Sequence, residues 1–260
     1  MAKKKAGGWA ETVKTVLYAA LIAVGIRTVA FEPFNIPSGS MEPTLLVGDY
    51  LFVSKYAYGY SRHSIPFSPP VFEGRIFGSL PERGDVAVFK LPSDTSQDYI
   101  KRIVGLPGDR IQVRGGILHV NGQAVRRELI GPYAAEDDGN RVLARQYRET
   151  LPNGVSHMIL EKTDEGQLDN VPCAQVDPAT GRCARLGEFL VPAGHVFAMG
   201  DNRDNSQDSR VLGAVGFIPV DNLVGRAEFI FFSVDGSASW VKPWTWPGAI
   251  RWSRLLSAVR

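Results

Sequence analysis

The sequence has few of the residues that build metal centres. It has two cysteines, Cys173 and Cys183, and four histidines scattered along the chain without the spacing of metal ligands. Two cysteines are too few for a four-cysteine zinc site, and no histidine is an obvious member of a Ser–His–Asp triad. We therefore expect no metal and no other cofactor, and a serine nucleophile in this chain needs a base other than histidine.

Excess charge of one sign and internal repetition are also missing. The net charge is +2 over 260 residues, and the body of the chain contains no long basic run. This balance gives no electrostatic reason to expect a nucleic-acid partner. With 44% hydrophobic and 22% charged residues, the composition is that of a globular protein of one or two domains.

The N-terminal apolar run is too short by itself to cross a bilayer. Thr15 to Ile26 is uncharged for 12 residues, whereas a span needs about 20. Residues 10–31 reach that length if Lys14 and Arg27 extend their side chains to the two interfaces. The lysines before this span predict a cytoplasmic N-terminus. The alternative, a signal peptide cleaved after Thr28–Ala30, also exports the rest of the chain.

Downstream of the anchor the pattern is that of β-strands. Alternating or apolar runs predict strands in 50–56, 85–90 and 98–105, and a further strand near 225–234. Gly115-Gly116 predicts a hairpin turn. Residues 56–81 are rich in Pro, Ser, Gly and aromatic residues, which favours a long loop or an extended hairpin.

Residues from about 125 to 190 are more charged and less periodic, which indicates an inserted or second subdomain. Both cysteines lie in it. Export favours a Cys173–Cys183 disulfide, which would contribute about 2–3 kcal/mol by closing a loop of this size. The alternative is two free thiols.

Two serines on a stiff loop are the candidate nucleophiles. Ser38 and Ser40 flank Gly39, and Pro37 and Pro43 restrict the backbone on either side. Taken alone, this composition is that of an ordinary turn. A serine hydroxyl becomes a useful nucleophile only beside a base, so the assignment depends on a partner elsewhere in the chain.

Lys101 is the candidate base, because it lies inside an apolar strand. On a strand it shares a face with Tyr99 and Ile103. A free lysine has a pKa near ~10.4, and burial disfavours the charged form and lowers that value. The alternative is a lysine that points into solvent from a strand edge.

The loop from Gly200 to Arg210, G-D-N-R-D-N-S-Q-D-S-R, offers supporting residues. Asp208 and Arg210 can form an ion pair, and Ser206 can hydrogen-bond a neutral lysine amine and orient it. A solvated turn is one alternative. A calcium loop is another, but an arginine occupies a position that needs an oxygen ligand.

Tryptophan is concentrated near the C-terminus. Four of the five tryptophans lie in the last 21 residues, at positions 240, 244, 246 and 252. Since tryptophan favours the membrane–water interface, we expect this tail to lie near the bilayer surface. The alternative is a tryptophan patch buried in the core.

These motifs together resemble the bacterial type I signal peptidases. P-S-G-S-M-E-P-T-L-L-V-G-D, R-G-D-V-A-V-F, Y-I-K-R-I-V-G-L-P-G-D and G-D-N-R-D-N-S-Q-D-S-R occur in the family's order. The resemblance covers roughly 27–110 and 189–232, and excludes about 125–188. It implies a mostly β fold: a catalytic β core related to the self-cleaving repressors, with an inserted second β subdomain, preceded by one transmembrane helix.

The resemblance also implies a role for each matching residue. Ser40 is the nucleophile, Lys101 the general base, and the Ser38 hydroxyl joins the Ser40 N–H in the oxyanion hole. Ser206 orients the lysine, and Asp208 and Arg210 form a supporting pair. The residues implied in shallow pockets for small substrate side chains are Phe34, Ile36, Met41, Leu45, Val88, Tyr99 and Ile100.

The implied function is removal of signal peptides from exported preproteins, after small residues in sites of Ala-X-Ala type, at the extracytoplasmic face of a bacterial inner membrane. We expect preproteins and phospholipid as partners, and a monomer. The alternatives are a self-cleaving repressor-type protein and a non-enzymatic exported β domain that binds a partner.

The expected segments are a cytoplasmic N-terminus (1–9), an anchor (10–31), a catalytic core (32–110 and 189–235), an insert (111–188) and a membrane-proximal tail (236–260).

Overall fold

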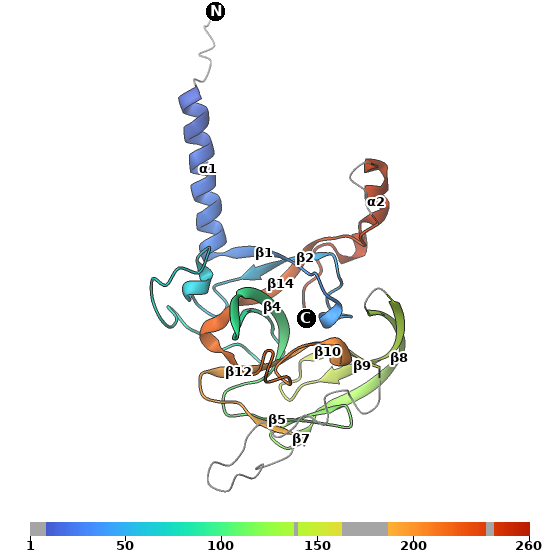
Figure 1. Ribbon diagram of the computed structural model, residues 1–260. Helices are drawn as coiled ribbons and strands as arrows, with labels where there is room; N and C mark the ends of the chain where they lie inside the picture. Colours follow the sequence, from blue (N-terminus) through green and yellow to red (C-terminus); the bar gives the residue numbers. More distant parts are fainter. Residues whose placement is uncertain (1–8, 138–139, 163–186, 238–241) are drawn as a thin grey trace, which may run out of the picture.

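The computed structural model describes residues 9–137, 140–162, 187–237 and 242–260. Within these ranges the chain is mostly β, with one long N-terminal helix (Figure 1). This confirms the predicted fold class. Cys173, Cys183 and Trp240 lie outside the described residues, so the expected disulfide stays a prediction.

A seven-stranded antiparallel sheet carries the segments that the motifs mark. Its central strand β3 is apolar and almost wholly buried, because β14 and β4 flank it and the core covers it. β1 lies at one edge of the sheet and contains Pro33. Proline lacks a backbone N–H, and an edge strand tolerates this because its outer side makes no ladder hydrogen bonds. In order across the sheet the strands are β1 (Phe31–Asn35), β2 (Asp49–Ser54), β14 (Leu223–Ser233), β3 (Val86–Leu91), β4 (Asp94–Gly105), β12 (His195–Met199) and β13 (Ile218–Pro219).

Two smaller sheets are built from the middle of the chain. One has the order β10 (Ser156–Glu161), β9 (Asn140–Thr150), β8 (Arg126–Asp137), and the other β11 (Glu188–Leu190), β5 (Arg110–Arg114), β6 (Ile117–Val120), β7 (Gln123–Ala124). Gly115 and Gly116 both have positive φ between β5 and β6, as the predicted two-residue hairpin turn requires. The long β8–β9 ribbon was not predicted, because its charged sequence shows little alternation.

The core ties the four-stranded sheet to the large one. Val104, Phe197 and Met199, at the ends of β4 and β12, share one hydrophobic cluster with Ile111 and Leu118 of the four-stranded sheet. The predicted boundaries at 110/111 and 188/189 therefore fall within a continuous hydrophobic cluster, and the division into a catalytic core and an inserted subdomain stays a prediction.

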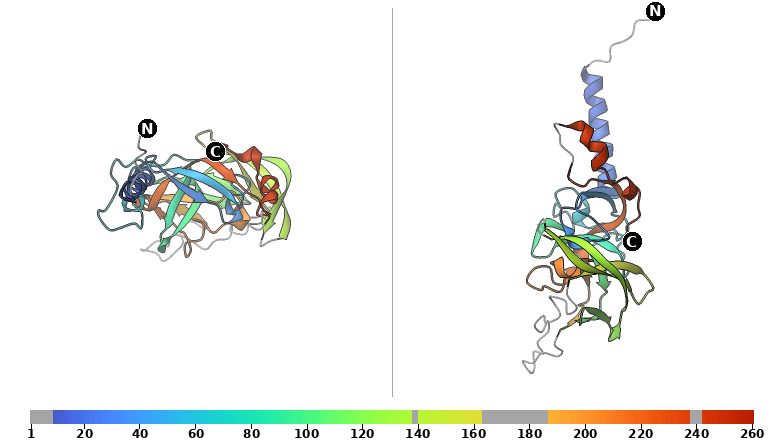
Figure 2. Two further views of the ribbon diagram at one scale, coloured as in Figure 1. Left: turned by 90° about the horizontal axis from the view of Figure 1, so that it is seen from above. Right: turned by 90° about the vertical axis from the view of Figure 1, so that its right-hand side faces the viewer.

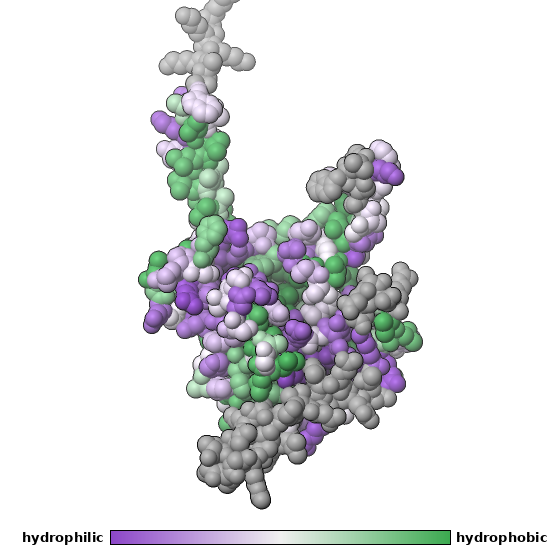
Figure 3. All heavy atoms as spheres, in the orientation of Figure 1, coloured by the Kyte–Doolittle hydropathy of each residue, from purple (hydrophilic) through white to green (hydrophobic). Residues whose placement is uncertain are grey.

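Helix α1 (Trp9–Val29) stands away from the β body, and none of its residues is buried (Figure 1). By length and composition it can cross a membrane. It ends two residues before the predicted end of the span at position 31, because Phe31 already belongs to β1. Figure 3 shows that the surface of α1 is hydrophobic along most of its length.

The C-terminal segment projects on the same side of the body as α1 (Figures 1 and 2). Trp244 and Trp252 are exposed there, and Trp246 is more than one-third exposed. The alternative prediction, a tryptophan patch buried in the core, is therefore wrong for these three residues. The short helices are η1 (Gly39–Met41), η2 (Arg62–Ser64), η3 (Arg203–Asn205), η4 (Val220–Asn222), η5 (Pro243–Thr245), α2 (Trp246–Ala249) and η6 (Trp252–Arg254).

Candidate active site

The serine loop follows directly from β1 and is held at both ends. Met41 and Leu45 are fully buried and anchor its far side in the core. Asn202 holds the near side: its backbone N–H donates to Ser40 O, and its Nδ2 donates to Gly39 O, both at 3.1 Å. Ser40 is therefore fixed by its own backbone, and its hydroxyl is directed into an open cleft.

Lys101 lies on β4 opposite Ala87 of β3, with its amine against the candidate nucleophile. Its Nζ is 2.7 Å from Ser40 Oγ and 2.9 Å from the carbonyl oxygen of Ile100. Only 4% of the residue is exposed, so the alternative of a solvated edge lysine is wrong. The two groups are in direct hydrogen-bond contact although 61 residues separate them.

Burial makes this amine easier to deprotonate. Removal from water lowers the pKa of Lys101 from 10.5 to about 8, against the opposing pull of the Asp208 and Asp201 carboxylates. The Arg210 guanidinium assists the lowering. A substantial fraction of the amine is therefore neutral near physiological pH, which is the state a general base requires.

Ser38 lies on the cleft side of Ser40, with the two hydroxyl oxygens 3.4 Å apart. Ser40 is in the first turn of η1, where backbone N–H groups have no carbonyl partner within the helix. An oxygen atom seated between the Ser38 hydroxyl and this N–H can accept hydrogen bonds from both. Such a pair of donors can stabilise a tetrahedral oxyanion.

Ser38→Ala is expected to lower the cleavage rate by about 10- to 1000-fold, as for the loss of one oxyanion donor. Stability should change little, because Ser38 is exposed and, among the described residues, its hydroxyl is hydrogen-bonded to Ser40 alone. Single-turnover rates of the two proteins on the same preprotein measure the effect. An unchanged rate would mean that another group donates to the oxyanion.

The 200–210 loop places Asp208 and Arg210 together as predicted. Arg210 Nε and Nη2 donate to the two Asp208 oxygens at 2.9 and 2.8 Å. Although burial raises it, the pKa of Asp208 is lowered overall by this guanidinium. Arg210 also donates to Arg203 O, and Gly200 N–H donates to Asp208. The pair thus fixes the shape of the loop beside Lys101.

Ser206 lines the same cleft as Lys101, but no hydrogen bond joins the two side chains. Its Oγ is buried beside the Asp208 carboxylate, and this contact helps to lower the pKa of Asp208. Gly200 packs against it: a Cβ at this position would lie 2.2 Å from Ser206 Oγ and 2.5 Å from Ser40 O. The contact explains why glycine occupies position 200, while the orienting role of Ser206 stays a prediction.

A buried ion-pair network behind the site was not predicted from the sequence. Arg102, with no exposed surface, binds both oxygens of Asp201 at 2.8 and 2.6 Å, and Thr44 Oγ1 donates to the same carboxylate. Arg203 is paired in the same way with Glu149 of β9. The network joins the serine loop, β4, the 200–210 loop and the β8–β10 sheet. The one sequence signal for this network was Arg102, a charged residue next to Lys101 in an otherwise apolar strand.

The cleft in front of the dyad has a volume of about 580 Å³, and Tyr99 and Ile100 line it together with both serines and Lys101. The remaining predicted substrate-contact residues lie elsewhere. Phe34 lines a neighbouring cavity. The other four belong to one hydrophobic core cluster and are at most 3% exposed: Ile36, Met41, Leu45 and Val88. Among the described residues, no group of three or more His, Cys, Asp or Glu side chains is arranged to hold a metal ion.

Comparison with known proteins finds a matching family model and several similar proteins. The family model described as "Signal peptidase, peptidase S26" matches residues 9–232. A signal peptidase I of Rickettsia typhi is 43% identical over 215 residues, which covers 82% of this chain and 76% of that protein. One from Rickettsia canadensis is 42% identical, over 86% and 80% of the two chains. A crystal structure of a signal peptidase I from Enterococcus faecalis is 24% identical, with a TM-score of 0.31, over 57% of this chain and 97% of that chain.

Proposed function

This chain belongs to the signal peptidase family, peptidase S26, and is a serine-type endopeptidase; on that premise we propose that it removes signal peptides from exported preproteins with a Ser40–Lys101 dyad while anchored in the membrane. The observation that carries the proposal is the 2.7 Å contact between Ser40 Oγ and a buried Lys101 amine. A hydroxyl and an amine so placed, facing an open cleft, have the geometry of a nucleophile and its base.

The reaction proceeds in two steps. Neutral Lys101 accepts the Ser40 proton as Oγ attacks the scissile carbonyl carbon, and the ammonium then gives a proton to the leaving amine. Water next attacks the ester carbonyl of the acyl-enzyme, with the amine again as base, and the signal peptide is released. The Ser38 hydroxyl and the Ser40 N–H hold the negative oxygen in both steps, an effect of about 3 kcal/mol per donor in a comparable protease.

Selection of small residues follows from how little room the core leaves. Ile36, Met41 and Leu45 are at most 3% exposed, so their side chains already fill the core next to the serine loop. A large residue would have to displace packed side chains, at a cost of about 1–3 kcal/mol. We propose that alanine and similarly small residues are accepted at substrate positions −1 and −3.

Membrane anchoring and orientation complete the proposal. Helix α1 is the membrane span, the lysines that precede it hold the N-terminus in the cytoplasm, and the exposed tryptophans of the C-terminal segment lie at the outer interface of the bilayer. Enzyme and preprotein are then held in one membrane, so they meet by diffusion in two dimensions. The enzyme acts as a monomer.

Cleavage of a preprotein by the full chain in detergent tests the proposal. With alanine at −1 and −3, the new N-terminus should begin at the +1 residue. Replacing the −1 alanine by leucine should lower kcat/KM by about 10- to 100-fold, the effect expected for overfilling a packed site. A preprotein that stays intact would contradict the proposed function. Equal cleavage after alanine and after leucine would contradict the proposed specificity.

A further inference from the structure

His157 is a buried histidine to which the proposed reaction assigns no role. It lies on β10, and only 4% of the residue is exposed. Its Nε2 is 3.4 Å from an oxygen of Glu149 and 3.8 Å from an oxygen of Asp201. Arg203 binds the first of these carboxylates, and Arg102 binds the second. The imidazole therefore lies where the two buried ion pairs of the network meet.

Asp201 connects this histidine to both sides of the dyad. Thr44 of the serine loop donates to the Asp201 carboxylate at 2.6 Å. Arg102, which binds the same carboxylate, directly follows Lys101 on β4. The negative charge of Asp201 also raises the pKa of Lys101 against the effect of burial. A displacement of this one carboxylate therefore reaches the serine loop and the base together.

The two ring nitrogens of His157 have different surroundings. Nε2 faces two carboxylates, which only accept hydrogen bonds, so the neutral ring carries its hydrogen on this atom. Nδ1 is buried and has no hydrogen-bond partner among the described residues, so a further proton has to bind there. The charged groups around the ring are Glu149 of β9, Asp201 and Arg203 of the 200–210 loop, Arg102 of β4, and, beside an adjoining cavity of about 360 Å³, Arg148 and Arg260.

A further proton on this ring disturbs the balance of charge in the network. Two guanidinium groups and two carboxylates cancel while the imidazole is neutral. An imidazolium adds a positive charge and competes with Arg102 for the Asp201 carboxylate. Burial and the nearby Arg102 guanidinium lower the pKa of His157 from 6.5, against the pull of the two carboxylates. The ring is therefore neutral at physiological pH and takes up a proton only below pH 6.5.

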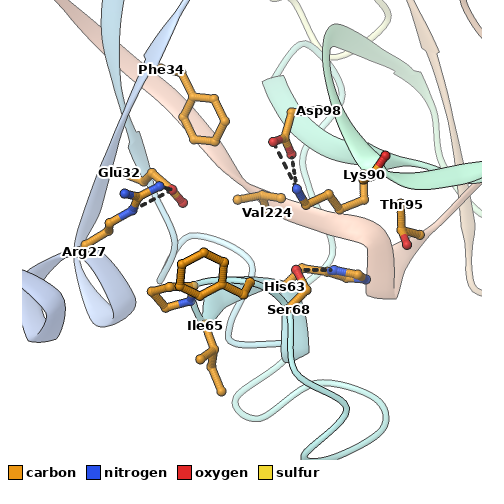
Figure 4. A pocket seen from close by; sticks show the side chains of 13 residues that line it. Arg27, Glu32, Phe34, His63, Ile65, Ser68, Lys90, Thr95, Asp98 and Val224 are labelled. Atoms are coloured by element: carbon orange, nitrogen blue, oxygen red, sulfur yellow. Dashed lines mark hydrogen bonds and ion pairs between the residues drawn. The ribbon is translucent and has the colours of Figure 1, made fainter.

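His63, which is also buried, lacks this arrangement. It lines the cavity at the base of α1, where Figure 4 shows its ring against Ser68. Its Nδ1 is 3.1 Å from Ser68 Oγ, and its Nε2 accepts a hydrogen bond from Arg62 Nε at 3.3 Å. Both ring nitrogens thus bond within their own loop, whereas the ring of His157 faces the ion pairs behind the dyad.

We propose that His157 is a positioning residue of the protease, which holds the Asp201 carboxylate in place as a neutral imidazole and displaces it on taking up a proton. This rests on the proposed function. Two separate protons then inactivate the enzyme in acid, one on the Lys101 amine and one on the imidazole behind it. Activity therefore falls more steeply with acidification than a single general base allows.

The acid side of the pH profile tests the proposal on the full chain in detergent. For a preprotein substrate, log kcat/KM should fall with a slope of about 1 per pH unit below about pH 8, where Lys101 takes up its proton. The slope should steepen to about 2 below the pKa of His157, which lies under 6.5. His157→Gln keeps an N–H donor but takes up no proton, so its slope should stay at about 1.

His157→Phe tests the positioning role at pH 8, where the wild-type ring is neutral. It removes the N–H donor between the two carboxylates, and kcat should fall by about 10- to 100-fold. KM should stay within about twofold of the wild-type value, because the catalytic cleft is lined by other residues. His157→Gln should recover most of the lost kcat. A glutamine variant as slow as the phenylalanine variant would contradict the assigned role.

Two control variants separate this histidine from other titrating groups. The ring of His119 hydrogen-bonds the Ile117 carbonyl of its own strand, and His119→Gln should keep the steep slope. Burial raises the pKa of Glu161 to about 7, so this carboxyl titrates in a nearby range. Glu161→Gln should keep the steep slope as well. Thermal melts at each pH, and recovery of the rate on return to pH 8, exclude unfolding as the cause.

A second measurement needs no substrate. Nitrogen-15 labelling of the histidine and arginine side chains, with His157 identified from the glutamine variant, should show a proton on Nε2 and none on Nδ1 at neutral pH. The side-chain signals of Arg102 should change as Nδ1 takes up its proton.

A wild-type slope that stays at about 1 down to about pH 5 would overturn the proposal. So would a slope of about 2 that persists in His157→Gln, or protonation of the ring with no change at Arg102. A wild-type protein that cleaves no preprotein at any pH would instead reject the proposed function, and the nitrogen-15 titration would still decide whether the imidazole displaces the carboxylate.

Discussion

Ser40→Ala is expected to reduce preprotein cleavage by about 10⁴- to 10⁶-fold, the range seen when a serine nucleophile is removed from a comparable protease. The fold should survive, since within the described residues the hydrogen bonds of the Ser40 hydroxyl are those with Lys101 Nζ and Ser38 Oγ. The loop is held instead by the Ser40 backbone carbonyl, which alanine retains. Single-turnover rates and thermal melts of the full chain in the same detergent measure both quantities.

Ser79→Ala is the matched control, an exposed serine of the 56–81 loop whose hydroxyl donates to the adjacent Leu80 carbonyl. It should cleave at the wild-type rate. If Ser40→Ala melts as the wild type does and still cleaves within about tenfold of it, a factor worth only ~1.4 kcal/mol, Ser40 is not the nucleophile.

Lys101→Met is expected to abolish cleavage to a similar extent while making the protein more stable at pH 6. The folded state disfavours the charged amine, so the pKa falls from 10.5 in the unfolded chain to about 8. Below pH 8 the full cost of holding a buried ammonium is present, and it disappears as the pH rises from about 8 to 10.5. Methionine removes that cost, which corresponds to about 3 kcal/mol at most.

The measurement is the free energy of unfolding of both proteins at pH 6 and pH 10. The gain from Lys101→Met should be about 1–3 kcal/mol at pH 6 and should shrink at pH 10. Lys101→Arg separates charge from basicity: it keeps a cation beside Ser40 but cannot deprotonate, so it should be as inactive as methionine. An arginine variant with near-normal cleavage would exclude the lysine as a base.

Local patterns in the sequence indicated the candidate residues of the site, and the family resemblance supplied the roles predicted for them. Lys101 stands in a run of apolar β residues, so its burial follows from the strand itself, and the Gly/Pro-restricted loop points to Ser38 and Ser40. Asp208 and Arg210 are two residues apart and meet without any tertiary information. Each of these features is encoded within a few residues of chain.

The interactions that were missed join distant segments. Arg102 and Asp201 are 99 residues apart, and Arg203 and Glu149 are 54 apart. Asn202 contacts the serine loop from the 200–210 loop, whose polar composition is typical of a solvated turn. No periodicity encodes which carboxylate meets a buried arginine, because the pairing is decided by how the sheets pack. The β8–β9 ribbon was missed for another reason, since its charged sequence shows little of the alternation that marks a strand.

The ionisation of Lys101 in the full chain tests the account most directly. Carbon-13 labelling of the lysine side chains, with the Lys101 signal identified from the Lys101→Met protein, allows its titration to be followed in detergent micelles. The account predicts a pKa of about 8, with kcat/KM rising through the same range as the amine loses its proton. A pKa that stays near 10.5, with a rate flat from about pH 5 to 9, would contradict it.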